Sequence, residues 1–232
     1  MPLILNLETS TSVCSVSLFE DEKVIAVHEQ ADAKSHASQL IPFIAEVLEK
    51  CRLTPKDLSA IAVSKGPGSY TGLRIGVSTA KGMAYALNLP LIAVGTLHSM
   101  ASGFLNKYPE YFNAPALLCP MIDARRMEVY SCVYNQKLRE IRSVEAEIIH
   151  PSSFLPLLKD YKIHFFGDGA MKCKEMILHE NAVFHDNFHP SAEFMGLISN
   201  EHFKNKVFED LAYFEPFYLK DFVTTTAINK MI

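Results

Sequence analysis

Residues 64–76 read Ser-Lys-Gly-Pro-Gly-Ser-Tyr-Thr-Gly-Leu-Arg-Ile-Gly, and this stretch decides how the chain folds. An apolar run that ends at Val63 precedes it, and a helical pattern continues from Thr71 to about Leu87. The stretch therefore predicts a buried strand, a turn and the start of a helix in direct succession. Ser69 or Thr71 is expected to cap the free amide groups at that helix start.

The start of a helix attracts anions, so this turn is a candidate phosphate-binding site. The two familiar phosphate motifs do not fit its residues. No Gly-Lys-Ser/Thr closes the turn as a P-loop requires. Gly66, Gly68 and Gly72 are spaced one residue too long for a dinucleotide-binding turn. The stretch therefore predicts local structure more firmly than it predicts a ligand.

Length and composition restrict the class of protein. The 232 residues are enough for one large domain or two small lobes, and 49% hydrophobic with 21% charged residues is typical of a soluble globular chain. A net charge of −4 disfavours unaided binding to tRNA or DNA. The five cysteines have no C-x-x-C spacing, so we expect buried, reduced thiols. We expect a cytoplasmic protein, because the first residues predict a strand and no apolar run is long enough to span a membrane.

Strands and helices alternate along the chain in the manner of an α/β protein. The first half predicts strands at 3–7, 13–19 and 23–29, a helix at 35–51, a strand at 58–63, a helix at 71–87, a strand at 91–94 and a helix at 96–105. The second half predicts strands at 116–122, 128–134 and 163–166, a helix at 191–201 and an extended segment at 213–219. Residues 137–162 have weak periodicity and fit either a strand or a helix.

The composition changes at residues 106–113, where polar residues and a proline interrupt the apolar pattern. We therefore expect two lobes, an N-terminal one of residues 1–105 and a smaller C-terminal one of residues 106–232. The last segment, from about residue 190 to residue 232, is a candidate to pack back on the first lobe.

Five segments, taken in order, resemble the TsaB family, which is also called YeaZ. They are Leu-Glu-Thr-Ser-Thr-Ser at 7–12, the glycine-rich stretch at 66–76, Asp-Ala-Arg-Arg-Met-Glu-Val-Tyr at 123–130, Gly-Asp-Gly at 167–169 and Glu-Pro-Phe-Tyr-Leu-Lys at 215–220. The similarity covers nearly the whole chain. It implies the actin/hexokinase/Hsp70-like (ASKHA, ribonuclease H-like) fold, with two related lobes of which the second is reduced. The elements predicted over residues 3–105 agree with the core of such a lobe.

The resemblance also implies a function. The implied function is that of a non-catalytic partner subunit in the synthesis of threonylcarbamoyladenosine at adenosine 37 of tRNA. The implied partners are a TsaD-type catalytic subunit and a TsaE-type ATPase, with tRNA reached through the complex and a homodimer formed when the chain is alone. The alternatives are an active ATP-dependent transferase of the ASKHA class and a peptidase of the glycoprotease type.

We expect no catalytic residue and no metal ion in this chain. The TsaD type holds its metal with two histidines four residues apart on one helix face. The matching positions here are His98 and Ser102, and serine is a poor metal ligand. His98 is therefore interpreted as a hydrogen-bonded structural residue. His185 and His189 have the same spacing, but their sequence context is that of a loop.

A nucleotide site is expected only as a remnant. Active ASKHA proteins carry an acidic residue after the first turn, and Glu8-Thr9-Ser10 is followed here by Thr and Ser instead. Glu8 is interpreted as a turn carboxylate bonded to backbone amides. The remnant is assigned to Glu8, Thr9, Ser10, Gly66, Gly68, Ser69, Gly167, Asp168 and Gly169, with a plain strand-ending turn as the alternative for the last three. The isolated chain is expected to hold no cofactor, although a nucleotide is a candidate ligand at the interface of the complex.

The predicted helices at 35–51 and 71–87 offer a surface for a partner. Small residues recur every four positions in the second helix, which favours close packing against either the chain's own sheet or another protein. In the TsaB family these two helices are understood to pair with TsaD. The predicted interface is Leu40, Phe43, Ile44, Val47, Gly72, Gly76, Ala80, Met83 and Ala84, and candidate tRNA or partner contacts are Arg74, Arg125 and Arg126. A large residue at Gly76 or Ala80 is predicted to weaken the heterodimer and leave the monomer folded.

Overall fold

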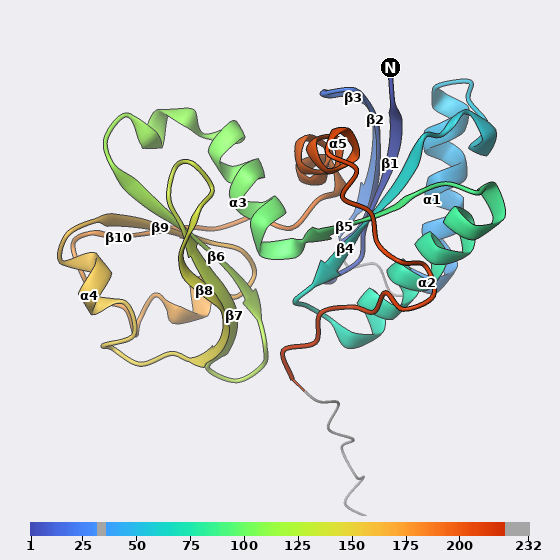
Figure 1. The fold of residues 1–232 in the computed structure, drawn as a ribbon. Helices are drawn as coiled ribbons and strands as arrows, with labels where there is room; N and C mark the ends of the chain where they lie inside the picture. The colour runs from blue at the N-terminus through green and yellow to red at the C-terminus, as the bar shows by residue number, and fades with distance from the viewer. Residues whose placement is uncertain (32–35, 221–232) are drawn as a thin grey trace, which may run out of the picture.

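The computed structural model describes residues 1–31 and 36–220, and its first five-stranded sheet belongs to the N-terminal half (Figure 1). The strand order is β3-β2-β1-β4-β5, with β1 at Leu3–Glu8, β2 at Cys14–Glu20, β3 at Lys23–Gln30, β4 at Ala60–Gly66 and β5 at Leu91–Gly95. The first three strands form an antiparallel meander, and β4 and β5 are parallel to β1. The fully buried pattern of β1 follows from its central position, where both faces are covered.

Helices cover both faces of this first sheet. On one face lie α1 (His36–Lys50) and α2 (Tyr70–Leu87), and a short 3-10 helix, η1 (Pro55–Asp57), connects α1 to β4. On the other face lie η4 (Ala192–Met195) and α5 (Gly196–Lys204), which close a small core around Ile4, Ile92 and Val94. The glycine-rich turn between β4 and α2 is therefore held by the sheet on one side and a long helix on the other.

The second half forms another five-stranded sheet, with the order β10-β9-β6-β7-β8. Its strands are β6 at Ala116–Asp123, β7 at Glu128–Tyr134, β8 at Glu140–Ile148, β9 at Lys162–Phe166 and β10 at Ala182–His185. Numbered within their own sheets, both sheets have their strands in the order 3-2-1-4-5. The helices of the second half are much shorter, α4 at Leu155–Leu158 and η3 at Met171–Cys173. The ambiguous residues 137–162 thus contain both a strand and one helical turn.

Helix α3 (Thr96–Lys107) joins the two sheets (Figure 1), and η2 (Pro109–Phe112) follows it. Although α3 follows β5 directly, its buried side chains Met100 and Phe104 pack with Leu118 and Phe166 of the second sheet. This helix therefore contributes to both halves. A division of the chain at residues 105 and 106 remains a proposal.

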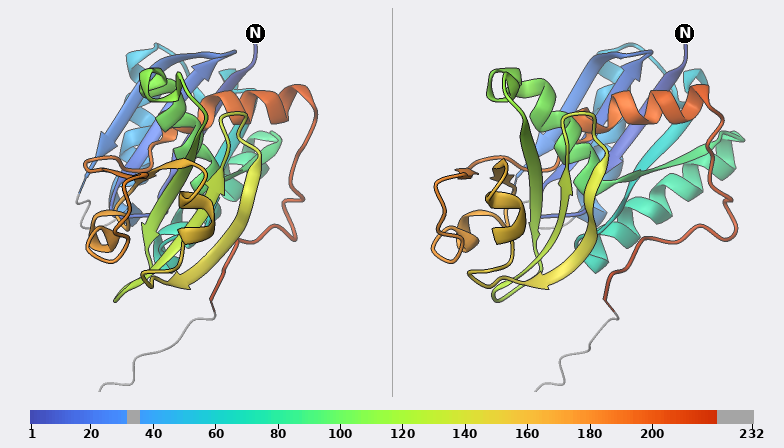
Figure 2. Two further views of the ribbon diagram at one scale, coloured as in Figure 1. Left: turned by 90° about the vertical axis from the view of Figure 1, so that its left-hand side faces the viewer. Right: turned by 60° about the vertical axis from the view of Figure 1, so that its left-hand side comes forward.

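Residues 191–220 return to the first sheet, as Figure 2 shows for α5 and the segment that runs from it past α2. Ser17 Oγ donates to the carbonyl of Ala192 at 2.8 Å, and Ser199 Oγ donates to Asn6 Oδ1 at 2.7 Å. Further along, Phe217 N donates to the carbonyl of Lys65 at 2.7 Å. The part of the predicted returning segment from residue 221 onward lies outside the described residues.

Within the described ranges, no helix combines the length and the apolar character needed to cross a lipid bilayer.

Candidate functional site

The glycine-rich turn after β4 lies directly against the turn between β1 and β2. Ser69 N donates to the carbonyl of Ser10 at 2.6 Å, and a Cβ on Gly68 would overlap that same carbonyl. Gly66 has φ +107°, a conformation that residues with a side chain rarely adopt. Ser69 is the cap of α2, because its Oγ accepts a hydrogen bond from Gly72 N at 3.2 Å. Close packing between two backbone turns therefore requires Gly68, and the backbone conformation favours glycine at position 66.

The second lobe has a matching turn after β9. Gly167 has φ +108°, and a Cβ on it would overlap the carbonyl of Met121. Asp168 Oδ1 accepts a hydrogen bond from Asp123 N at 3.0 Å, which ties this turn to the end of β6. Desolvation and the neighbouring Asp123 carboxylate raise the pKa of Asp168. Gly66 and Gly167 thus occupy equivalent ends of equivalent strands.

The two turns face each other across a cleft of about 760 Å³ between the lobes. The first lobe lines it with Ser10, Thr11, Ser12, His36, Gly68, Ser69, Tyr70 and Thr71, and the second lobe with Ile122, Asp123, Ala124, Arg125, Arg126, Glu128, Tyr130 and Asp168, together with Lys220. The structure therefore brings together predicted residues from four separate segments of the chain, which contain Ser10, Gly68, Arg125 and Asp168.

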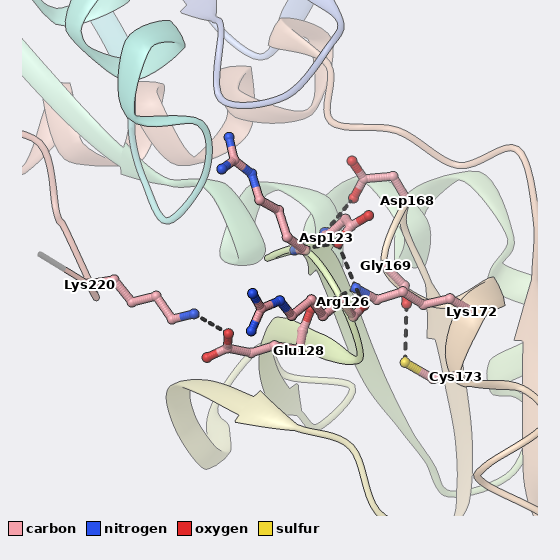
Figure 3. A network of polar contacts seen from close by, with 9 residues as sticks. Asp123, Arg126, Glu128, Asp168, Gly169, Lys172, Cys173 and Lys220 are labelled. Atoms are coloured by element: carbon pink, nitrogen blue, oxygen red, sulfur yellow. Dashed lines mark hydrogen bonds and ion pairs between the residues drawn. The ribbon is translucent and has the colours of Figure 1, made fainter. Parts of the chain in front are cut away.

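The carboxylates at the second-lobe edge of the cleft are largely neutralised within the chain (Figure 3). Lys172 Nζ lies 2.6 Å from Asp123 Oδ1 and also donates to the carbonyls of Arg126 and Glu128. Lys220 pairs with the Glu128 carboxylate. Arg125 and Arg126, both exposed, form no ion pair with a carboxylate in the described part of the chain. The cleft can therefore attract an anion to these two guanidinium groups.

Of the residues assigned to a nucleotide remnant, Glu8 and Thr9 are fully buried beneath the cleft and do not line it. Glu8 is fully buried, and its Oε1 accepts hydrogen bonds from Ser10 N at 2.7 Å and Ser64 Oγ at 2.9 Å. Burial raises the pKa of the Glu8 carboxyl. Thr9 Oγ1 donates to the carbonyl of Gly72 at 2.8 Å. Glu8 is thus a turn carboxylate that accepts a hydrogen bond from a backbone amide, and its burial keeps it out of reach of a ligand in the cleft.

The histidines His98, His164 and His185 pack against other aromatic side chains of the chain. His98 is stacked on Tyr134 with a centroid distance of 5.6 Å, and Ser102, four residues on, is buried. His185 Nε2 lies 2.8 Å from Nδ1 of His164, and burial lowers the pKa of His164 to about 4. Sequence spacing gave no indication of this pair, because it joins adjacent strands β9 and β10. Over residues 1–31 and 36–220, no three His, Cys, Asp or Glu side chains converge as a potential metal site.

Most residues of the predicted partner interface face the chain's own sheet. Leu40, Phe43, Ile44 and Val47 of α1 are at most 6% exposed and belong to the core of the first lobe. A Cβ on Gly72 or Gly76 would overlap Thr9 in the turn after β1, and Ala80 and Ala84 have no exposed surface. Met83 packs partly against the same core. The small side chains therefore let α2 approach its own sheet closely.

The outer face of α1 and α2 was not predicted. Residues Thr71, Ile75, Ser78, Gly82 and Tyr85 follow one stripe of α2, and Ala37, Ile41 and Ala45 follow one of α1. A Cβ on Gly82 would meet no described atom within 4 Å, and Ile41 and Tyr85 are 55% and 81% exposed. A groove of about 500 Å³, lined by Ala37, Tyr70, Thr71, Arg74, Ile75, Ser78 and Thr79, runs along this face. The signal in the sequence was Gly82, an interior helix glycine that lies outside the inner stripe of Gly72, Gly76, Ala80 and Ala84.

Two α/β lobes of identical strand order, joined by a helix and facing each other across a cleft, define a protein of the actin/hexokinase/Hsp70-like (ASKHA) class. The chain belongs to the TsaB (YeaZ) family, and its residues 24–228 match the wider TsaD family, described as tRNA N6-adenosine threonylcarbamoyltransferase.

Of three comparisons with known proteins, the first shows the family. The chain is 34% identical over 177 residues to the tRNA threonylcarbamoyladenosine biosynthesis protein TsaB of Bacillus subtilis (strain 168), which covers 75% of this chain and 74% of that one. It is 28% identical over 233 residues to TsaB of Haemophilus influenzae, covering 95% and 94%. The structure of YeaZ from Pseudomonas aeruginosa has a TM-score of 0.81 at 24% identity, over 94% of this chain and 100% of that chain, which shows the shared fold.

Proposed function

We propose that this chain is a non-catalytic partner subunit in the synthesis of threonylcarbamoyladenosine on tRNA, and that it works in the cytoplasm. Its relatives in Bacillus subtilis and Haemophilus influenzae are named as biosynthesis proteins for this modification. In the proposal, a TsaD-type subunit performs the chemistry, a TsaE-type ATPase joins the pair, and tRNA binds to the assembled complex. The alternatives remain an active transferase of this fold class and a glycoprotease-like peptidase.

The residues at the expected catalytic positions support the non-catalytic role. Ser102 occupies the place of the second metal-binding histidine, and it is buried at 4% exposure. Glu8 is sealed beneath the turn with its Oε1 already bonded to Ser10 N and Ser64 Oγ. Neither side chain is available to bind a metal ion or to orient a nucleophile in the cleft.

The observation that carries the proposal is the exposed glycine on the outer face of α2. A glycine in the interior of a helix destabilises it by about 1 kcal/mol relative to alanine. Gly82 has no described neighbour that would require its lack of a side chain. Close approach of a second protein's backbone supplies the missing reason. We therefore place the docking surface for the TsaD-type subunit on this face, and the same face serves a homodimer when the chain is alone.

The cleft fits the phosphate group of a nucleotide held at the interface of the complex. The capped start of α2, with Gly68 and Ser69, lies on one side, and Arg125 and Arg126, which pair with no carboxylate of the described residues, lie on the other. A helix start and guanidinium groups both stabilise a bound anion. In this proposal the nucleotide binds with the partner present, and the isolated chain turns none over.

Reconstitution with the cognate TsaD-type and TsaE-type subunits tests the function directly. We expect modified tRNA only when all three proteins are present, and no ATP hydrolysis or glycoprotein cleavage by this chain alone. Equal product formation with this chain omitted would contradict the proposal. Turnover of ATP or of a glycoprotein by the purified chain would support one of the two enzymatic alternatives instead.

A further inference from the structure

We propose that Arg74 binds a carboxylate group of the partner subunit and thereby selects the partner that covers the outer face of α1 and α2. This inference rests on the proposed function, because it names the chemical group that the docking surface recognises. The groove beside Arg74 can accommodate a side chain of the partner, and the guanidinium group is oriented to bind its carboxylate.

The Arg74 side chain is exposed and yet held in one orientation. Its guanidinium carbon lies 4.2 Å from the centroid of the Tyr70 ring, and its Nε donates to Tyr218 Oη at 3.3 Å. The Tyr70 and Tyr218 rings are themselves 4.8 Å apart. Two aromatic side chains, one from α2 and one from the C-terminal segment, thus fix the planar group before any partner arrives.

Among the described residues, no hydrogen bond or ion pair occupies the fork formed by the two terminal nitrogen atoms of Arg74. Nε is the nitrogen that donates to Tyr218, and no ion pair joins Arg74 to a carboxylate among residues 1–31 and 36–220. The field of Glu215 reaches Arg74 without forming such a pair. A guanidinium group that is already oriented, and whose two terminal nitrogen atoms bind no described residue, is suited to bidentate contact with an oxyanion.

The surroundings favour a carboxylate over the backbone of an RNA. Arg74 is the one charged residue among the described residues that line the groove, and its neighbours there are small or uncharged, such as Ala37, Ser78 and Thr79. Proteins that bind a nucleic-acid backbone present several cations along its path, because each phosphate carries a charge. A single cation in an uncharged groove matches a single negative charge on a protein side chain.

The test measures the affinity of purified variants for the cognate TsaD-type subunit by calorimetry at two salt concentrations. We expect Arg74→Met to weaken the heterodimer at least about 10-fold and to reduce its salt dependence, because a hydrogen-bonded charge pair is lost at the interface. Arg74→Lys should recover only part of the affinity, because an ammonium group lacks the planar fork. Arg139→Met, which removes an exposed arginine from the second lobe, is the matched control and should change nothing.

Two further variants sharpen the assignment. Tyr218→Phe removes the hydroxyl that positions Arg74, so we expect a smaller loss of affinity than for Arg74→Met. Arg74→Glu should bind least, and replacing each surface carboxylate of the TsaD-type subunit in turn by lysine should restore binding at one position. The restoring position identifies the partner carboxylate.

The outcomes separate this inference from the proposed function. If the wild-type chain and Arg74→Met bind the TsaD-type subunit with equal affinity, the inference is overturned and the proposed function remains intact. A variant that keeps heterodimer affinity but weakens tRNA binding by the assembled complex also overturns it, in favour of an RNA contact. Effects limited to homodimerisation overturn it as well. Wild-type chain that does not bind the TsaD-type subunit at all contradicts the proposed function itself.

Discussion

On the inner face of α2, a Cβ on Gly76 would overlap Thr9 in the turn after β1, whereas on the outer face a Cβ on Gly82 would meet no described atom within 4 Å. The two glycines lie on one helix, six residues apart, and have the same chemistry. The first is required by the chain's own packing, and the second has no such requirement. The comparison teaches that a small residue shows that something approaches closely, while the fold alone shows whether that neighbour belongs to the same chain.

The largest expected effect comes from filling the inner face. Gly76→Leu should lower the free energy of unfolding by about 3 kcal/mol or more, because the added side chain forces α2 away from β1. Urea denaturation followed by circular dichroism measures the change. This expectation reverses the one drawn from the sequence, in which the monomer stays folded. An unchanged unfolding midpoint would restore the earlier interpretation.

Filling the outer face should affect binding and leave folding intact. Gly82→Phe is expected to weaken the heterodimer with the TsaD-type subunit at least about 10-fold, because the bulky ring prevents close approach of the partner's helices. Its unfolding midpoint should remain near that of the wild type. Lys159→Phe, at an exposed position in the second lobe, is the control for an added aromatic ring. Equal affinity of the Gly82 variant and the control would remove this face from the interface.

A minimal change on the outer face should stabilise the chain. Gly82→Ala is expected to raise the free energy of unfolding by up to about 1 kcal/mol, because alanine favours the helix and no described atom opposes its methyl group. The same change at Gly76 should destabilise, since its methyl group would overlap Thr9. Denaturation curves of the two alanine variants should therefore show changes in the free energy of unfolding that have opposite signs.

The smallest expected effect on stability concerns Glu8, which precedes Thr9, the residue packed against the inner face of α2. Burial raises its pKa in the folded chain, so the folded state holds this proton more tightly than the unfolded state does. The stability that this group contributes is fully present below the unfolded pKa and is lost as pH rises through the folded pKa. Glu8→Gln should therefore flatten the fall in stability as the pH rises above 4.5, the ordinary pKa of a glutamate. A parallel pH dependence in both proteins would show that another group is responsible.

Sequence patterns predicted most elements because their periodicity is local. The three strands of the meander, the two long helices and the turn at 64–76 lie close to their predicted positions. Residues 137–162 were ambiguous because β8 is an edge strand with exposed and half-buried residues, so it lacks a clear apolar alternation. The cleft was predicted in part, since Ser10, Gly68 and Asp168 meet there, but its ion pairs through Lys172 were not.

Residues near one another in the chain were enough to predict the α/β class, the glycine turn, the cap of α2 as one of two residues and the similarity to the TsaB family. Only the tertiary structure decided which face of α2 is buried, that Glu8 is sealed beneath the cleft and that Arg74 is held by Tyr70 and Tyr218. Those facts depend on segments far apart in sequence, and a helical stripe carries no information about what packs against it.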